Sequence, residues 1–397
     1  MKHLYLFLPG VAAGLLLAAC GGGIPGPMEQ SNTGGAAAAQ RQAGPPGTPA
    51  CPKTNSDEAR CQLIIQKTGV QADVAGWGPA DLQAAYNLPS SSNGSGQIVA
   101  IVDAYDNPNV ASDLAEYRSH FGLPPANFTK YNEAGQTDNY PKSCNNAKIA
   151  HWGWCVEIDL DVEVVSAVCP NCTIYLVEAK DNNRLDTAEA RAVKLGAHIV
   201  TNSWGWSRKI SVSDFDTKGV VYLAAAGDSN YGSSVPAELA NVVSVGGTIL
   251  AKRGSKYKEI VWPWTGGGCD LPFAKPAWQH DPDCKYRMAN DVAAVADDFA
   301  EYDTYASETG WLTVGGTSVA SPLIASVYAL AGNASSQQGG KELWTLPTEQ
   351  RKKYLHAITE GSDGRCGGSY FCTAGTGQYG TYSGPGGWGS PNGIGAF

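Results

Sequence analysis

Short apolar runs alternate along the chain with longer segments whose apolar residues recur at helical spacing. The short runs predict buried strands at 97–102, 173–177, 197–201, 220–225, 242–245 and 291–295. The longer segments predict helices at 79–86, 110–121, 156–168, 185–195 and 318–331. Strands that alternate with helices predict an α/β domain with a mostly parallel sheet and helices on both of its faces. Ligand sites in such sheets lie beyond the carboxyl ends of the strands.

The first residues of the chain resemble a bacterial export signal. Lys2 precedes an apolar stretch, 4–17, which Pro9-Gly10 interrupts and which is too short for a membrane span. Leu17-Ala18-Ala19-Cys20 then resembles a lipoprotein cleavage box, with Cys20 as the lipidated residue. An ordinary signal peptide with a chance cysteine is the alternative. We expect an exported lipoprotein, anchored by acyl chains on Cys20 at the cell surface or the periplasmic face, that can also be shed.

Residues 21–72 precede the alternating pattern and differ from it in composition. Up to residue 50 they are rich in Gly, Ala, Pro, Gln and Ser, and such a segment cannot bury enough apolar surface to order itself. The stretch Cys61-Gln62-Leu63-Ile64-Ile65 is expected to form a short helical patch. We therefore predict a flexible linker or short N-terminal extension at 21–72, followed by one domain at 73–397.

Composition narrows the class of protein. Charged residues make up 16% of the 397 residues, below the roughly 25% of an average globular domain. The 48 Gly, 11 Trp and 18 Tyr suggest a loop-rich secreted domain with aromatic packing. A net charge of −9 argues against nucleic acid as a partner, and we expect a monomer.

The cysteines suggest a disulfide framework. Of the 11 cysteines, Cys20 is assigned to lipidation, and the remainder is an even number in an exported chain. Cys169-Pro-Asn-Cys172 alternatively resembles half a zinc site or a redox motif, but no second such motif accompanies it, so a disulfide is favoured. Proximity along the chain, which does not fix the connectivity, suggests the pairs Cys51–Cys61, Cys144–Cys155, Cys169–Cys172, Cys269–Cys284 and Cys366–Cys372.

Ser318 is the candidate nucleophile. It follows Gly315-Gly316-Thr317 and opens the helix expected at 318–331. The glycines allow close approach of a substrate, and a helix N-terminus offers unpaired amide donors to a developing oxyanion. A simple Thr-Ser helix cap is the alternative. The motif resembles the subtilisin nucleophile frame, but none of the 6 histidines lies in a His-Gly-Thr-His setting. Because a serine hydroxyl is a poor nucleophile without a base, another residue type is needed.

A pair of carboxylates on the helix expected at 156–168 can supply that base. Glu157 and Asp161 lie one helical turn apart and therefore share a face. Ile158, Leu160 and the following valines leave little room for a solvated acidic face, which is the alternative. Burial of two neighbouring carboxylates favours a shared proton, and such a pair is a suitable base in acid.

Asp228 follows the strand expected at 220–225, in Ala225-Ala226-Gly227-Asp228. Subtilisin-like proteases carry an asparagine at the comparable position, and its amide donates to the oxyanion. An ionised aspartate would repel that charge, whereas a protonated one can donate a hydrogen bond, so the residue fits a site that works in acid. An Asp-Ser turn after a strand is the alternative.

Together these segments resemble the sedolisin family of serine-carboxyl peptidases, including its kumamolisin-like bacterial members, over roughly residues 75–397. Asp103 matches the aspartate of the subtilisin triad and is expected to be a supporting residue of the network. Trp204 either shapes the cleft or is purely structural. The motifs that carry the resemblance are Trp77-Gly78-Pro79-Ala80-Asp81-Leu82, Val99-Ala100-Ile101-Val102-Asp103, Glu157-Ile158-Asp159-Leu160-Asp161-Val162-Glu163, Asn202-Ser203-Trp204-Gly205, Ala225-Ala226-Gly227-Asp228-Ser229, Gly246-Gly247-Thr248, Pro276-Ala277-Trp278-Gln279 and Gly315-Gly316-Thr317-Ser318.

The resemblance implies a subtilisin-like fold and endopeptidase activity on polypeptides in acid. Carried over onto this sequence, it implies that Ser318 is the nucleophile and Glu157 its general base and acid. Asp161 would orient Glu157 and share its proton. Asp228 would help the Ser318 amide to stabilise the tetrahedral oxyanion, so that a carboxylate replaces the imidazole of the usual triad.

Two departures from the family pattern bear on folding and on metal binding. The stretch between Cys20 and Trp77 is too short for the long prosegment that assists folding and blocks the cleft in family members. The family's calcium site uses two aspartates, where this chain has Ala357 and Ser383. Losing two carboxylate ligands weakens calcium binding, so we expect no metal and no other cofactor. The pair Cys366–Cys372 is expected to staple that loop instead.

Two function classes remain. The favoured one is an exported, lipid-anchored acid endopeptidase. The alternative is a catalytically weak or inactive surface lipoprotein that uses a peptidase scaffold to bind polypeptides. A neutral subtilisin-type protease is disfavoured because the histidine frame is missing.

Overall fold

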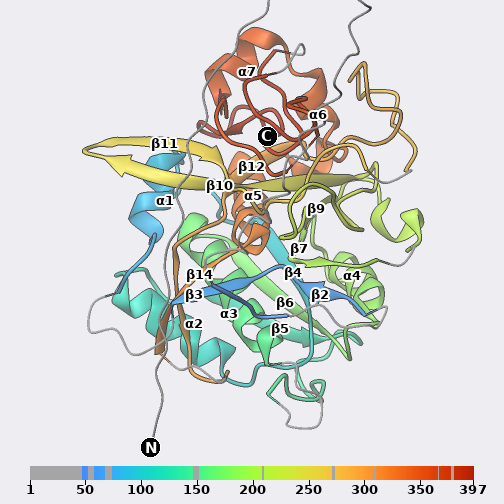
Figure 1. Ribbon diagram of the computed structural model, residues 1–397. Coiled ribbons are helices and arrows are strands. Elements are labelled where there is room, and N and C mark those ends of the chain that lie inside the picture. Colours follow the sequence, from blue (N-terminus) through green and yellow to red (C-terminus); the bar gives the residue numbers. More distant parts are fainter. Residues whose placement is uncertain are drawn as a thin grey trace, which may run out of the picture. The chain divides into compact units, whose positions relative to one another are not determined.

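The main sheet is parallel apart from one hairpin (Figure 1). Within the described residues it has the strand order β11–β10–β9–β7–β4–β6–β5, with β12 also paired to β10. Only the pair of β10 and β11 is antiparallel there. The mostly parallel α/β sheet expected from the sequence is therefore confirmed. Its strands are β4 (Ile98–Ala104), β5 (Asn127–Asn132), β6 (Thr173–Ala179), β7 (Ile199–Asn202), β9 (Val221–Ala225), β10 (Val242–Arg253), β11 (Lys256–Val261) and β12 (Val292–Val295).

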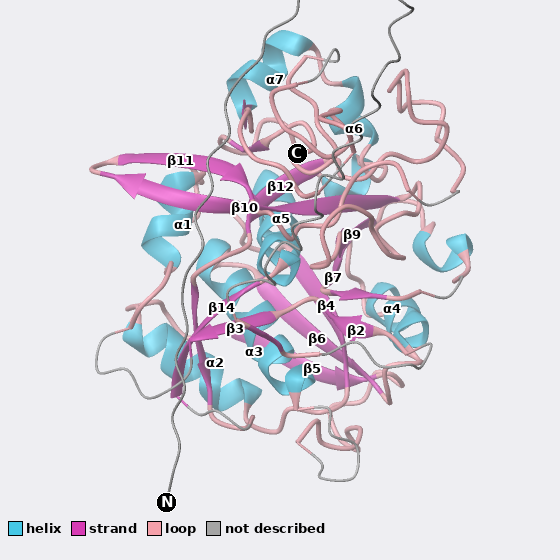
Figure 2. Cartoon of the chain, in the orientation of Figure 1, coloured by secondary structure: helices cyan, strands magenta, loops and turns pink. Residues whose placement is uncertain are grey.

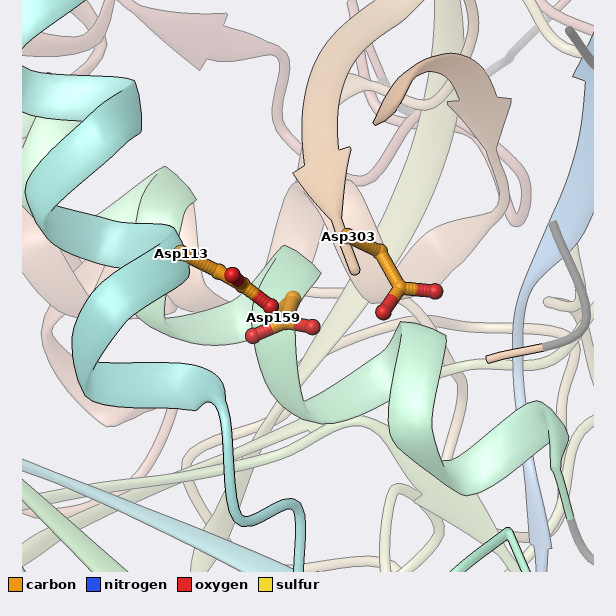
Figure 3. Close-up of side chains that lie close together, drawn as sticks. All are labelled: Asp113, Asp159 and Asp303. Atoms are coloured by element: carbon orange, nitrogen blue, oxygen red, sulfur yellow. The ribbon is translucent and has the colours of Figure 1, made fainter. Parts of the chain in front are cut away.

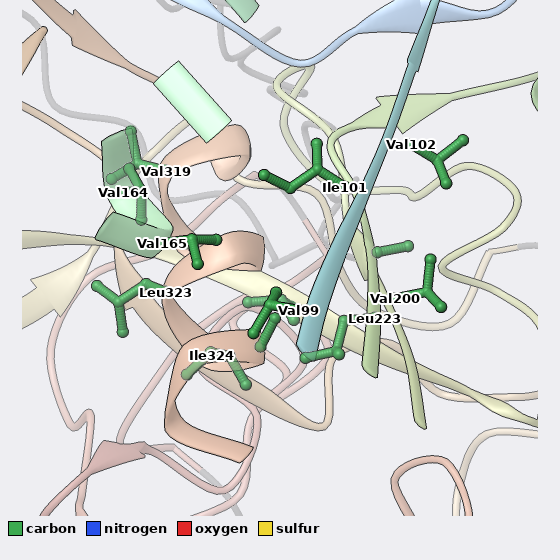
Figure 4. Packing of buried hydrophobic residues seen from close by; sticks show 14 of the residues in the cluster. Val99, Ile101, Val102, Val164, Val165, Val200, Leu223, Val319, Leu323 and Ile324 are labelled. Atoms are coloured by element: carbon green, nitrogen blue, oxygen red, sulfur yellow. The ribbon is translucent and has the colours of Figure 1, made fainter. Parts of the chain in front are cut away.

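Helices α3 and α5 pack together against this sheet and form the centre of the core. Figure 4 shows Val164 and Val165 of α3 beside Val319 and Leu323 of α5, with Val99 of β4 close by. Both helices are buried on nearly every side because both are enclosed by the domain, although α3 also carries acidic residues. The helices are α1 (Pro79–Ala85), α2 (Val110–His120), α3 (Gly153–Val168), α4 (Leu185–Lys194), η1 (Val212–Phe215), α5 (Thr317–Ala331), η2 (Ala334–Ser336), α6 (Lys341–Thr345) and α7 (Thr348–Tyr354).

The N-terminal segment adds strands to the edge of this domain. β2 (Arg60–Cys61) pairs with β8 (Trp204–Gly205). The predicted helical patch at 61–65 is therefore wrong. The segment is extended because its two halves find strand partners that lie far away in the sequence. A smaller sheet has the order β1 (Thr48–Pro49), β3 (Ile64–Lys67), β14 (Gly310–Gly315) and β13 (Phe299–Asp303), and β15 (Leu355–His356) pairs with β16 (Ser390–Pro391).

The computed structural model describes residues 47–51, 58–67, 74–145, 152–207, 210–270, 273–306, 310–364, 366–376 and 380–397, all within one unit that spans Gly44–Phe397. The described part of 21–72 thus packs with the domain that follows it. The predicted signal segment and the lipidation at Cys20 lie outside these residues. In the described part of the chain, no helix has both the length and the apolar character needed to cross a membrane.

Disulfides and aromatic rings hold the loops. Figure 2 shows long loops around α6 and α7, in line with the glycine-rich composition. Trp344 packs against Tyr382 and Trp388 there, with ring centroids 4.5 and 5.3 Å away. The structure contains each disulfide that proximity along the chain suggested, namely Cys51–Cys61, Cys144–Cys155, Cys169–Cys172, Cys269–Cys284 and Cys366–Cys372.

Candidate active site

Three elements bring the candidate residues to the carboxyl ends of the parallel strands. Helix α3 carries Glu157 and Asp161, helix α5 begins at Thr317 with Ser318 next to it, and β4 ends just after Asp103. The side chains of Glu157, Asp161 and Ser318 have an exposed fraction of 0%. Gly316 precedes α5 with a φ of 121°, which side-chain-bearing residues rarely adopt, so the turn into this helix requires glycine.

The hydroxyl of Ser318 lies between a backbone carbonyl and a carboxyl group. Its Oγ donates to the carbonyl oxygen of Ser203 at 3.2 Å. Ser203 in turn donates from its own Oγ to Oδ1 of Asp161 at 2.7 Å. Neither carboxyl oxygen of Glu157 has a hydrogen-bond partner among the described residues, although the nearby Ser318 hydroxyl acts to lower the pKa of Glu157. The free acceptor at Glu157 is therefore available for the Ser318 proton.

Burial and mutual repulsion hold protons on this group of acids. Burial is the main cause that raises the pKa of Glu157 well above its usual value, followed by the charges of Asp161 and Asp103. Burial and then Asp103 raise the pKa of Asp161 as well, against the hydrogen bond from Ser203. Burial raises the pKa of Asp103 to about 8. The three carboxyl groups therefore cannot all be ionised together, and the group shares protons.

Asp228 lies at the start of α5, beside Thr317. Its Oδ1 accepts hydrogen bonds from the backbone N–H and the Oγ1 of Thr317, at 2.8 and 2.9 Å. Its Oδ2 is buried without a partner among the described residues. Burial raises the pKa of Asp228 to about 7, against the hydrogen bonds from Thr317 and the charge of Arg60. In acid the carboxyl is therefore neutral and can donate a hydrogen bond from Oδ2.

The two supporting residues take different positions. Both oxygens of Asp103 are buried without a hydrogen-bond partner in the described part of the chain, and Asp103 acts on the acids of α3 through its charge. Trp204 is fully buried, and its indole N–H donates to the carbonyl of Val102 at 3.1 Å. The Trp204 side chain is thus structural, while its backbone forms β8.

A second acidic cluster, Asp113, Asp159 and Asp303, has the geometry of a candidate metal site (Figure 3). Its oxygens already accept hydrogen bonds from Thr304, Asn107 and the backbone N–H groups after Asp303. Burial raises the pKa of Asp159 well above its usual value and that of Asp303 to about 6. The cluster therefore holds protons at acidic pH, and by itself it does not indicate a ligand.

At the two positions where the sequence led us to expect calcium ligands, this chain has no carboxylate. Ala357 offers a methyl group, and the Oγ of Ser383 accepts a hydrogen bond from the N–H of Gly386 at 3.2 Å. Calcium prefers several carboxylate and carbonyl oxygens, which these two side chains do not supply. The loop closed by Cys366–Cys372 packs here, where Gly384 N donates to Tyr370 O at 2.7 Å.

Comparison with known proteins places this chain in a family. The profile of the subtilase family matches residues 133–370. The chain belongs to the subtilase family. Its curated relatives include kumamolisin of Bacillus sp. (strain MN-32), 29% identical over 335 residues that are 72% of this chain and 57% of kumamolisin. Sedolisin of Pseudomonas sp. (strain 101) is 23% identical over 377 residues, or 82% of this chain and 61% of sedolisin.

A solved structure shows the same fold. Pseudomonas sedolisin, a serine-carboxyl proteinase complexed with two molecules of pseudo-iodotyrostatin, superposes with a TM-score of 0.67 at 23% identity, over 81% of this chain and 96% of that one. The resemblance to sedolisins and the subtilisin-like fold expected from the sequence are therefore confirmed. The chain covers only part of the length of its curated relatives. The matched regions are 57% of kumamolisin and 61% of sedolisin.

Sequence reasoning missed two residues of the site. Ser203 was noted only within the motif Asn202-Ser203-Trp204-Gly205, and nothing in that motif shows that it bonds Asp161. Thr317 was noted only as a neighbour of the nucleophile. It donates two hydrogen bonds to Oδ1 of Asp228, and Oδ2 has no hydrogen-bond partner among the described residues. A polar residue directly beside a catalytic motif is the signal that points to such positions.

Proposed function

We propose that this subtilase is an exported serine-carboxyl endopeptidase that hydrolyses polypeptides at acidic pH. One observation supports this function most directly. The carboxyl group of Glu157 is buried and free of hydrogen bonds beside the hydroxyl of Ser318, within a group of acids that shares protons. Because these acids share protons, loss of one proton leaves a single carboxylate in the group, and the Ser318 hydroxyl, which acts to lower the pKa of Glu157, favours that charge on Glu157.

The first half of the reaction forms an ester on Ser318. While Asp161 holds the shared proton, ionised Glu157 takes the proton from Ser318 Oγ as this atom bonds to the substrate carbonyl carbon. The oxyanion that develops accepts hydrogen bonds from the Ser318 N–H and from the proton on Asp228 Oδ2. Protonated Glu157 then gives its proton to the amine nitrogen as the C–N bond breaks.

The second half regenerates the enzyme. Glu157 takes a proton from a water molecule, whose oxygen attacks the ester carbon. The same oxyanion donors stabilise the second tetrahedral intermediate, and the proton returns from Glu157 to Ser318 Oγ as the acid product leaves. Every proton movement thus uses the one carboxyl group that faces the hydroxyl.

The proposal includes the setting of the enzyme. We propose that the chain is exported and anchored to a membrane through Cys20, and that it acts as a monomer without a metal or other cofactor. The residue types at 357 and 383 support the last point, since alanine and serine replace the two expected carboxylates.

Peptide cleavage measured from about pH 3 to about pH 8 tests this function. The variants are Ser318→Ala and, as a matched control, Ser326→Ala in the same helix, where Oγ bonds only the carbonyl of Pro322 among the described residues. We expect wild type and Ser326→Ala to be active in acid and Ser318→Ala to be inactive. Cleavage that survives in Ser318→Ala refutes the function, and a wild type without any cleavage favours the polypeptide-binding scaffold.

A further inference from the structure

A cavity of about 530 Å³ lies at the carboxyl ends of β4, β5 and β6, the edge of the sheet at which the candidate active site is also found. Figure 1 shows these three strands side by side. The lining includes Tyr105, two residues after Asp103, and also Tyr140 and Pro141 between β5 and α3. The volume is within the range of ligand pockets in proteins, and none of these lining residues takes part in the mechanism above.

Hydrogen bonds fix one wall of this cavity in the absence of a ligand. The side chain of Asn132 accepts the N–H of Ala134 on Oδ1 at 2.9 Å and donates from Nδ2 to the carbonyl of Asp138 at 2.8 Å. The hydroxyl of Tyr140 donates to the carbonyl of Thr137 at 2.8 Å. The loop that carries Asn132 and Tyr140 is therefore preformed, and a ligand can bind there without ordering it first.

Two lysines give the cavity a positive charge. Lys142 and Lys180 are exposed residues of the lining, and neither forms an ion pair with another described residue. The carboxylate of Glu133 in the lining is already paired, since Arg184 Nη2 lies 2.8 Å from its Oε1. Asp181 is the other acid of the lining. Two unpaired ammonium groups thus outnumber one unpaired carboxylate, and the cavity attracts an anionic group.

A polypeptide backbone runs past the rim of the cavity. The hydroxyl of Tyr105 donates to Oδ1 of Asn182 at 3.2 Å. Asn182 bonds the backbone of Ala59 twice, from Nδ2 to the carbonyl at 3.2 Å and from the N–H to its own carbonyl at 3.4 Å. Burial raises the pKa of Tyr105 to about 12, and the nearby charges of Asp181 and Glu58 act in the same direction. The residue before Ala59 is thus close to Tyr105.

The register of this backbone relates the cavity to the nucleophile. After Ala59, β2 is antiparallel to β8, and the N–H of Ser318 donates to the carbonyl of Gln62 at 3.1 Å. Addition of an extended segment to a strand edge is a general mode of peptide recognition. A substrate that takes this place along β8, with its reacting carbonyl at the Ser318 N–H, has its fifth residue before the cleaved bond at the position of Glu58.

We propose that the cavity beside Tyr105 is a substrate subsite that selects an acidic side chain at the fifth residue before the cleaved bond. This inference rests on the proposed peptidase function and names a class of substrate for it. The rings of Tyr105 and Tyr140 contact the apolar part of the acidic side chain. The ammonium groups of Lys142 and Lys180 attract its carboxylate. Because both lysines are exposed, the gain in affinity is small but measurable.

Two peptides that differ only in glutamate or glutamine at this fifth position test the subsite. Their kcat/KM values are compared at about pH 5, where a glutamate side chain is mostly ionised. We expect wild type to cleave the glutamate peptide about threefold more efficiently, mainly through a lower KM. The preference should decrease with added salt, because salt screens the attraction between exposed charges.

A charge reversal in the cavity tests which residues carry the preference. Lys142→Glu combined with Lys180→Glu should make the glutamine peptide the better substrate. Lys194→Glu combined with Lys256→Glu is the matched control. It makes the same change in net charge at the far end of α4 and in β11, and it should keep the wild-type preference. A preference for glutamate that survives the reversal in the cavity overturns the inference.

The outcomes separate this inference from the function on which it rests. A wild type that cleaves both peptides with equal kcat/KM overturns the subsite and leaves the peptidase function standing. A wild type that cleaves neither peptide overturns the function, and the inference with it.

Discussion

Ser203 Oγ donates a hydrogen bond of 2.7 Å to Oδ1 of Asp161, in the interior of the domain. This bond lowers the pKa of Asp161 against burial and the charge of Asp103. Ser203 thereby biases the shared proton between Asp161 and its neighbours on α3. It positions the acid pair without contacting the scissile bond through its side chain.

Removing that hydroxyl should change the pH profile of the reaction. Ser203→Ala takes away a bond that favours ionised Asp161, so the pKa of Asp161 should rise and the acidic limb of kcat should move to higher pH. In the proposed mechanism Asp161 is protonated while Glu157 acts as the base, so we expect the maximal kcat to be kept or to increase. Ser203→Thr keeps the hydroxyl and should restore the profile. A lower rate with an unshifted limb would mean that Ser203 is only structural.

Asp228 sets the upper pH limit in this account. Its pKa is raised to about 7, so the carboxyl loses its donor proton as the pH rises through that value. Asp228→Asn keeps a donor that does not ionise. We expect some turnover to remain and the upper limit of the pH profile of kcat/KM to move to higher pH. An unchanged profile would argue against a protonated Asp228 in the oxyanion hole.

Buried acids make the stability of the folded protein depend on pH. Burial raises the pKa of Asp303 to about 6 and that of Asp103 to about 8, and it also raises the pKa of Asp159. A carboxyl whose pKa is higher in the folded state binds protons more tightly there. Its contribution to stability is therefore complete below the unfolded pKa of about 4 and is lost as the pH rises through the folded pKa.

Thermal denaturation between about pH 4 and about pH 8 checks this sign. We expect Tm to be highest in acid and to fall toward neutral pH, with a smaller fall in Asp159→Asn. Glu349→Gln, an exposed acid of α7 paired with Lys352, is the control and should follow wild type. A Tm that increases with pH over this range contradicts the account.

Calcium should matter little to this protein. Since Ala357 and Ser383 supply no carboxylate, adding EDTA should leave Tm and peptide cleavage unchanged. The variant Ala357→Asp with Ser383→Asp restores both acids and should gain a calcium-dependent increase in Tm. A clear loss of Tm with EDTA in wild type would show that other residues bind the metal.

The sequence predicted most of the fold because the central elements are strongly periodic. The apolar runs of β4 and β9 and the helices α3 and α5 are buried on all sides, so their residue patterns need no knowledge of partners. Strand β5 (Asn127–Asn132) was missed because it is an edge strand with mixed polar and aromatic residues, most of them half-buried. Its pairing with β6 decides its structure, and pairing is non-local.

The structure of the N-terminal segment also depends on partners that are distant in the sequence. An apolar stretch such as Leu63-Ile64-Ile65 fits a helix or a strand equally well, and only the distant partners β8 and β14 select the strand. Glu157 and Ser318 were found because their side chains stand in recognisable motifs. Gln62 was not found, because it contacts the Ser318 N–H through its backbone carbonyl, which any residue carries.

The central claim is that the carboxyl group of Glu157 takes the proton of Ser318. The most direct measurement compares kcat/KM at about pH 4 for wild type, Glu157→Gln and Glu163→Gln. Glu163 is equally buried on the same helix but bonds the N–H of Tyr302, which glutamine can also do. We predict a loss of roughly 10²- to 10⁴-fold for Glu157→Gln and little change for Glu163→Gln. Wild-type kcat/KM in Glu157→Gln would contradict the account.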